Sequence, residues 1–234
     1  MIEVKFPDSS TRSYAKGTTV LDVAKDISEG LARNVLSAKF NNRTVETASA
    51  LQEDGDLQLF TWNDTPGKTA FWHSSAHVLA QSILALYPEA KLTIGPAIEN
   101  GFYYDVDFGS ESLSEKDLVS LEKKFIEFSR QKFEFKMRAA SKQEALDFYK
   151  KEGNPYKVEL IENLEDGTIT FCDHADFTDL CRGGHIPNTG FIKAIKLLSV
   201  AGAYWRGDEK NNQLTRIYGI SFPKQKELNQ HLEL

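Results

Sequence analysis

Residues 2–27 have the sequence IEVKFPDSSTRSYAKGTTVLDVAKDI, and their pattern predicts how the first part of the chain folds. Ile2, Val4 and Phe6 alternate with charged residues, and this period of two predicts a half-buried strand. Residues 7–14 combine a turn-forming cluster with a short polar run, which favours a tight turn and a return strand. The chain is therefore predicted to begin with a β-hairpin.

A helix is predicted directly after this hairpin. Thr18 or Thr19 can cap its first turn, and Gly30 is expected to end it. Its apolar face is formed by Val20, Val23, Ala24 and Ile27. Short strands are expected next, at residues 37–40, 44–45 and 57–61. A hairpin followed by a helix and further strands is the order of a β-grasp fold, so the sequence predicts a small domain of this type.

The segment Asn63-Asp64-Thr65-Pro66-Gly67 is rich in residues that interrupt helices and strands, and it is the predicted domain boundary. Beyond it the pattern predicts a larger domain that mixes helices and strands. Predicted helices cover residues 69–87 and begin after Ser114, Ser141 and Pro223, the last of them running to Leu234; strands are predicted within residues 92–108, 156–161 and 168–220.

The composition is that of a folded protein, because 41% of the 234 residues are hydrophobic and 26% are charged. The net charge of -6 argues against a broad nucleic-acid-binding surface, but it is compatible with a local site for one end of an RNA. Two cysteines are too few for a disulfide framework. No stretch is apolar over the roughly 18 residues that a membrane span needs, so we expect a cytoplasmic protein that does not enter the membrane.

Histidine and cysteine gather in two parts of the sequence. His73 and His77 lie four residues apart in the helix predicted over residues 69–87, so their side chains point the same way. Cys181 and His185 repeat this spacing in a later segment. These residue types bind zinc or transfer protons near neutral pH, so the two pairs together favour a functional site.

Each of these residues also has an ordinary structural interpretation. A histidine beside an apolar stripe is more often a hydrogen-bonded, partly buried residue than a ligand. A third pair, Cys172 and His174, is interpreted as structural because cysteine is often a small buried hydrophobe.

The segment between Cys181 and His185 has the composition of a loop that approaches a ligand. Gly183 and Gly184 disfavour a helix and allow the backbone to pass close to a bound molecule. Asp179 and Arg182 are polar residues beside this loop, and their simplest interpretation is a surface ion pair.

Five blocks of sequence resemble the N-terminal region of the threonyl-tRNA synthetase family, and together they span most of the chain. They are HSSAH at 73–77, IGP at 94–96 with NGFYYD at 100–105, YKV at 156–158, DLCRGGHIP at 179–187 and AGAYWRGD at 201–208. A single HxxxH is weak evidence, but these blocks in this order are specific. The family usually has proline at the position of Gly184, which is a departure of this chain.

The resemblance implies an α+β protein of two domains. Residues 1–61 would be a TGS domain with a β-grasp, ubiquitin-like fold, and residues 62–222 a larger two-layer α/β editing domain. Residues 223–234 would begin a linker helix to a synthetic domain outside this sequence. That domain would attach threonine to tRNA(Thr) with ATP, magnesium and a zinc ion of its own. The parent enzyme would be a homodimer, and the present chain is expected to be a monomer.

The resemblance also implies a reaction, the hydrolysis of seryl-tRNA(Thr) made in error, with the serine-bearing 3′ end of the tRNA as the partner. The implied catalytic residues are His73, His77, Lys157, Asp179, Cys181 and His185, and the implied substrate-binding residues are Tyr104, Arg182, Gly183 and Gly184. Editing is expected to need no metal or other cofactor. The alternative is a zinc ion held by His73, His77, Cys181 and His185.

The sequence alone is also compatible with other classes of protein. A non-catalytic zinc-binding or RNA-binding module would bind zinc stoichiometrically and unfold on chelation. A free-standing trans-editing factor would differ only in where the natural chain ends. TGS-like modules also occur in GTPases, but the sequence has no GxxxxGK[ST] phosphate-binding loop, and the two cysteines do not form the CxxC pair of a redox enzyme.

Overall fold

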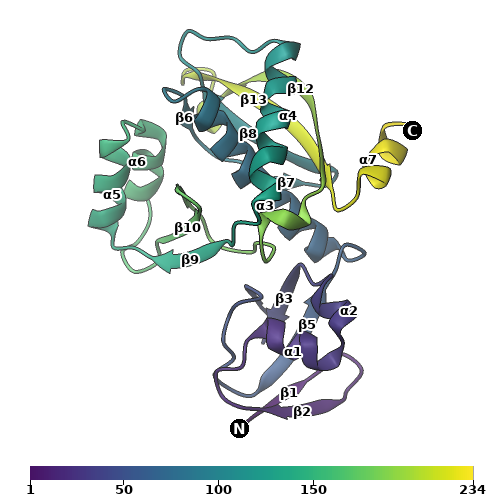
Figure 1. Ribbon diagram of the computed structural model, residues 1–234. Coiled ribbons are helices and arrows are strands. Elements are labelled where there is room, and N and C mark those ends of the chain that lie inside the picture. Colours follow the sequence, from purple (N-terminus) through teal and green to yellow (C-terminus); the bar gives the residue numbers. More distant parts are fainter. Residues whose placement is uncertain (234) are drawn as a thin grey trace. The chain divides into compact units, whose positions relative to one another are not determined.

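Figure 1 shows the computed structural model, which describes residues 1–233. The chain divides into two compact units. The first contains residues 1–74 and 183–187, and the second contains residues 75–182 and the chain from residue 188 onward. The helix α3 (Thr65–Leu86) continues without interruption through the junction at residue 74. None of the helices within residues 1–233 combines the length and the apolar character that crossing a bilayer requires.

The first unit contains the expected β-grasp fold. Its mixed sheet has the strand order β2 (Thr11–Tyr14), β1 (Ile2–Lys5), β5 (Gly55–Phe60), β3 (Ser37–Phe40) and β4 (Arg43–Val45). Only β1 and β5 run parallel in this sheet, and the other neighbours are antiparallel. The helix α1 (Val20–Ile27) contributes Val20 and Val23 to a core that also buries Val4 and Leu57. The alternation along β1 therefore buries one face of the strand, as predicted.

The first helix begins as predicted but ends earlier. Thr19 caps it, because its side-chain oxygen accepts from the backbone N–H of Asp22 at 3.1 Å. The prediction that Gly30 ends the helix is wrong, since Gly30 lies inside a second short helix, α2 (Glu29–Ala32). Ser28 separates the two helices: its N–H donates to the last turn of α1, and its hydroxyl accepts from Leu31 N–H at 3.0 Å.

The second unit is built on two antiparallel sheets. The larger has the order β12 (Ala194–Tyr204), β13 (Gln213–Phe222), β8 (Gly101–Asp107) and β6 (Lys91–Leu92), with β7 (Ala97–Ile98) also paired to β8. The helix α4 (Glu115–Arg130) lies along this sheet (Figure 1), and its Glu122 carboxylate accepts from the Leu197 N–H of β12 at 2.8 Å. The predicted capping box of Ser114 and Asp117 starts α4. The C-terminal helix α7 (Gln225–Leu232) begins two residues after Pro223, and Leu234 lies outside the described residues.

The smaller sheet of this unit carries a second core. It has the order β11 (Phe177–Leu180), β10 (Thr170–His174) and β9 (Lys136–Ala139), and it adjoins α5 (Lys142–Lys151) and α6 (Pro155–Glu162). Tyr149 of α5, Ile161 of α6 and Phe171 of β10 are buried together in this core. The predicted N-cap Ser141 starts α5 by accepting from Glu144 N–H. Two 3₁₀ turns, η1 (Thr189–Phe191) and η2 (Trp205–Gly207), complete the unit.

The prediction of a strand over residues 156–161 is wrong, because these residues form α6. Asn154 caps this helix, and Pro155 occupies its first turn, where a missing N–H costs nothing. The side chain of Asn154 accepts from Lys157 N–H at 3.1 Å and donates to the Leu92 carbonyl at 2.8 Å. The cap therefore fixes both the start of the helix and the position of Lys157.

We expect Asn154→Ala to lower the free energy of unfolding by about 1–3 kcal/mol, because it removes an N-cap and leaves the Leu92 carbonyl without this donor. Urea denaturation measures the change. Asn163→Ala, at the other end of α6, is the matched control, because Asn163 is exposed and donates only to the helix carbonyl of Glu159. Equal losses in the two variants would contradict the capping role.

Candidate active site

A buried carboxylate lies at the centre of the second unit. Asp179 points inward from β11 and is 3% exposed. One of its oxygens accepts from the Lys157 ammonium at 2.6 Å and from the Tyr149 hydroxyl at 3.3 Å. Its other oxygen accepts from the Tyr104 hydroxyl at 3.1 Å and lies 3.3 Å from Nδ1 of His77. Four different secondary-structure elements therefore supply partners to this one charge.

The surroundings of Asp179 decide its protonation state. Burial alone would raise its pKa, but the Lys157 ammonium and then the His77 imidazole outweigh burial and lower the pKa well below the ordinary value. Burial would lower the pKa of His77, whereas Cys181 and Asp179 beside it raise the pKa above its ordinary value. Burial and then the Asp179 charge raise the pKa of Tyr104 well above normal, so its hydroxyl remains a neutral donor. The site thus combines the ionised carboxylate of Asp179 with side chains that donate hydrogen bonds to it.

Tyr104 reaches Asp179 because a glycine makes room for its ring. A Cβ atom at Gly95 would lie only 2.1 Å from the Tyr104 ring. Real Cβ atoms do not approach that closely, so any side chain at this position must displace the tyrosine from the carboxylate. The IGP block at residues 94–96 therefore has a local steric role beside the site.

Both serines of the HSSAH block at residues 73–77 of α3 form hydrogen bonds to distant parts of the chain. Ser74 is buried, donates to the Ala70 carbonyl at 2.7 Å and accepts from the Ile186 N–H at 3.0 Å. Ser75 is hydrogen-bonded to Ser221 of β13 at 2.7 Å. The two serines therefore hold the loop at residue 186 and the strand β13 against α3, each within its own unit.

The loop after Cys181 adopts a backbone that few residues tolerate. Gly183 and Gly184 have φ angles of +97° and +88°, in a region that L-residues other than glycine rarely adopt. His185 follows and is fully buried, and its ring stacks on that of His73 with centroids 4.8 Å apart. Arg182, one of the predicted substrate-binding residues, is exposed beside the loop.

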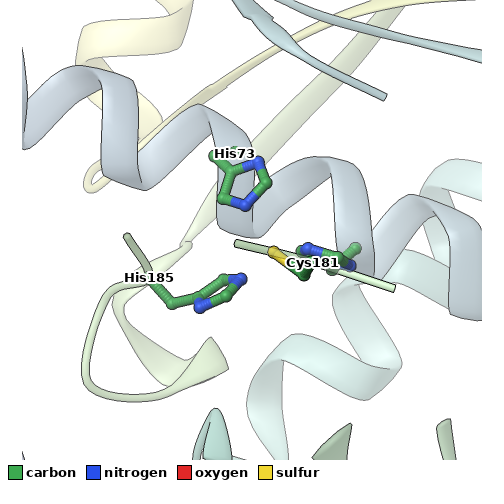
Figure 2. A group of neighbouring side chains, drawn as sticks. His73, Cys181 and His185 are labelled. Carbon is green, nitrogen blue, oxygen red and sulfur yellow. The ribbon is translucent and has the colours of Figure 1, made fainter. Parts of the chain in front are cut away.

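The four predicted histidine and cysteine ligands form two pairs. His73 stacks on His185 in the first unit, and His77 interacts with Cys181 in the second. One turn of α3 joins the two histidines that begin these pairs, and Cys181 and His185 are only four positions apart in sequence. The ligand atoms of the four side chains all lie within 4.8 Å of one another, and Figure 2 shows His73, Cys181 and His185. Three imidazoles and a thiol are a donor set that zinc accepts, so these residues fit a zinc ion chemically.

A cavity of 340 Å³ opens beside the buried ion pair of the second unit. Lys157, Asp179 and Tyr149 contribute to its lining, together with Lys91 and Glu152. The cavity thus reaches the ion pair, but none of the four histidine and cysteine residues contributes to its lining.

These contacts test several predictions made from the sequence. A surface ion pair involving Asp179 is wrong, because Asp179 is buried and its cationic partner is Lys157. The structural interpretation of His174 agrees with its buried position and its hydrogen bond to Gln81 at 3.1 Å. Tyr149 was not predicted, since its contact with Asp179 depends on tertiary packing that leaves no local pattern.

Comparison with known proteins matches two parts of the chain to family models. Residues 2–61 match the TGS domain, and residues 169–218 match the threonyl and alanyl tRNA synthetase second additional domain. The whole chain is 64% identical to threonine–tRNA ligase of Flavobacterium johnsoniae, 63% to that of Flavobacterium psychrophilum and 56% to that of Cytophaga hutchinsonii. Over its full length the chain is therefore similar to the N-terminal region of threonine–tRNA ligases.

These relatives are much longer than the chain. The alignments cover 100% of the chain but 36% of each of the three ligases. The TGS match contains the β-grasp sheet, and the second match contains β10, β11 and the loop that carries Cys181 and His185. The α+β fold, with a TGS domain and a larger α/β region, therefore agrees with the prediction.

We expect Asp179→Asn to lower the free energy of unfolding by about 3–5 kcal/mol at pH 7, because it leaves the buried Lys157 ammonium without its counter-charge. Urea denaturation measures the change. Asp26→Asn is the matched control, because Asp26 pairs with Arg12 at the surface and its loss should matter far less.

The same comparison has a pH dependence. The lowered pKa of Asp179 in the folded state means that its charge stabilises the fold above the ordinary aspartate pKa of about 4. That contribution is lost as the pH falls further, so the difference between the parent chain and Asp179→Asn should shrink below about pH 4. A difference that stays constant from pH 7 to pH 3 would show that folding does not lower the pKa of Asp179.

Proposed function

We propose that this chain hydrolyses seryl-tRNA(Thr) and so removes serine that a threonine–tRNA ligase has attached in error. The observation that carries the proposal is the buried Lys157–Asp179 pair, with His77 against the same carboxylate and Cys181 against His77. A buried, charged network beside a cavity is typical of a catalytic site rather than of a structural core. The match to the second additional domain of threonyl and alanyl tRNA synthetases supports the same function.

The chemical need for such a site follows from the two amino acids. Serine is threonine without one methyl group, and a missing methyl group in a pocket is worth only about 1–3 kcal/mol of discrimination. A synthetic site shaped for threonine must also admit serine. A second site that accepts serine and is too small for threonine supplies the remaining selectivity.

The reaction is the hydrolysis of an ester. The oxygen of a water molecule bonds to the carbonyl carbon of the seryl group, and the bond from that carbon to the ribose oxygen breaks. The ribose oxygen takes up a proton, so the products are serine and a tRNA with an intact terminal adenosine. The step needs a positioned water and positive charge near the carbonyl oxygen.

The side chains of this chain can be assigned to these needs. His73 orients the water and the terminal ribose hydroxyl, and Lys157 stabilises the carbonyl oxygen. Asp179 receives the ammonium of the seryl group, which would then share the carboxylate with Lys157. The remaining residues line and polarise the site: His77, Cys181, His185, Tyr104, Arg182, Gly183 and Gly184.

We also propose an activity for the whole ligase. It would attach threonine to tRNA(Thr) with ATP, magnesium and a zinc ion, through the part of the relatives that this chain does not match. It would do so as a homodimer in the cytoplasm, with the present chain monomeric.

We expect the chain to release serine from seryl-tRNA(Thr) and to leave threonyl-tRNA(Thr) intact. His73→Ala and Lys157→Ala should each abolish this hydrolysis, because one removes the residue that orients water and the other the positive charge. Release of labelled amino acid from each tRNA measures the reaction.

The matched controls are His231→Ala and Lys150→Ala, which alter an exposed histidine and an exposed lysine of the same chain. Both should hydrolyse seryl-tRNA(Thr) like the parent. Undiminished hydrolysis in His73→Ala and Lys157→Ala would overturn the assigned roles, and equal hydrolysis of both tRNAs would overturn the selectivity.

We expect hydrolysis to persist after chelation of the purified chain, with zinc well below one ion per chain. Elemental analysis and a deacylation assay with and without chelator measure this. One zinc ion per chain together with unfolding on chelation would instead favour the zinc-binding structural module.

A further inference from the structure

We propose that Glu46, a residue of the TGS domain, is a positioning residue for His185. Its carboxylate contacts both the backbone and the imidazole of the loop that follows Cys181. The inference rests on the proposed function, and it extends that function by giving the TGS domain a part in hydrolysis.

Three nitrogen atoms of the loop converge on the Glu46 carboxylate. The Gly184 N–H donates to one oxygen at 2.7 Å, and the His185 N–H donates to the other at 3.1 Å. Nδ1 of the His185 ring lies 3.2 Å from the first oxygen. All of these residues belong to the first compact unit. Two consecutive backbone N–H groups that converge on one anion form a binding site for that anion, so the loop is built around the carboxylate.

The contact between Glu46 and the His185 ring is largely shielded from water. His185 is fully buried, and the Glu46 side chain is 19% exposed. A carboxylate beside Nδ1 favours the tautomer in which Nδ1 carries the proton and donates it to Glu46, so Nε2 presents a lone pair. The same contact fixes the plane of the ring, which stacks on His73. Glu46 therefore sets both the orientation and the tautomer of a residue that we assign to the hydrolytic site.

The backbone of the loop points to the same conclusion. Gly184 donates its N–H to Glu46 from a φ of +88°, which other L-residues rarely adopt. The space around Gly184 is not the reason for glycine there, since a Cβ atom would meet Thr44 only at an ordinary contact distance of 3.7 Å. Glycine is required for the backbone conformation, and this conformation directs the N–H at the carboxylate.

The test compares Glu46→Gln with Glu53→Gln in the 234-residue chain. Glu53 is an exposed glutamate of the same domain, so its variant is the matched control. We expect Glu46→Gln to lower the turnover of saturating seryl-tRNA(Thr) by about 10- to 100-fold, as the loss of a partner that orients a histidine does. The KM for seryl-tRNA(Thr) should change by less than about threefold, because Glu46 contacts His185 rather than the substrate. Glu53→Gln should behave like the parent.

A second measurement reads the tautomer directly and needs no activity. Nitrogen-15 NMR of the histidine side chains distinguishes a proton on Nδ1 from one on Nε2. We expect His185 of the parent to carry the Nδ1 proton and to lose this preference in Glu46→Gln and Glu46→Ala.

The two measurements separate the inference from the proposed function. A parent chain that does not hydrolyse seryl-tRNA(Thr) refutes the function, while the NMR signal still tests whether Glu46 positions the ring. A parent in which the His185 proton lies on Nε2 overturns the inference, whether or not the variants fold. Parent-like turnover in a folded Glu46→Gln chain also overturns it.

Discussion

One buried negative charge organises the second unit. A carboxylate removed from water is costly unless it is paired and hydrogen-bonded, and Asp179 is both. Its partners come from α3, β8, α5 and α6, so each of these elements must hold one side chain at a fixed distance from one point. The arrangement depends on where α6 begins, because the cap at Asn154 holds the Lys157 N–H and so positions Lys157.

The elements that could be predicted are those whose signals are local. Alternation along Ile2–Lys5 and the cap at Thr19 depend on neighbouring residues, and both agree with the structure. Residues 156–161 carry no such signal, since the proline and asparagine before them can start a helix or break the chain before a strand. Glycine at position 30 is typical of a helix end, but α1 already ends at Ser28, whose side chain caps the start of α2 and places Gly30 inside that helix. A capping serine and a terminal glycine compete in sequence, and the local geometry decides.

The residues of the site also differ in whether a local sequence signal predicts them. The HxxxH spacing of His73 and His77 could be predicted, because helical geometry fixes it. The depth of Asp179 could not, because burial depends on partners far along the chain. Glu46 is the hardest residue to predict, since it lies 139 positions before His185 and nothing around it in sequence distinguishes it from a surface glutamate. The residues of a motif can therefore be predicted from sequence, whereas those that position the motif emerge from the fold.

The antiparallel pairing of β8 with β13 has a consequence for synthesis of the chain. A ribosome releases α3 and β8 long before β13, yet Ser75 of α3 bonds to a residue of β13 that is 146 positions later. The larger sheet therefore cannot close until nearly all of this chain has emerged, and its apolar face stays exposed during that interval. The β-grasp strands, all within the first 60 residues, can pair much earlier. Nascent chains should thus carry an ordered N-terminal domain while the larger sheet has not yet formed.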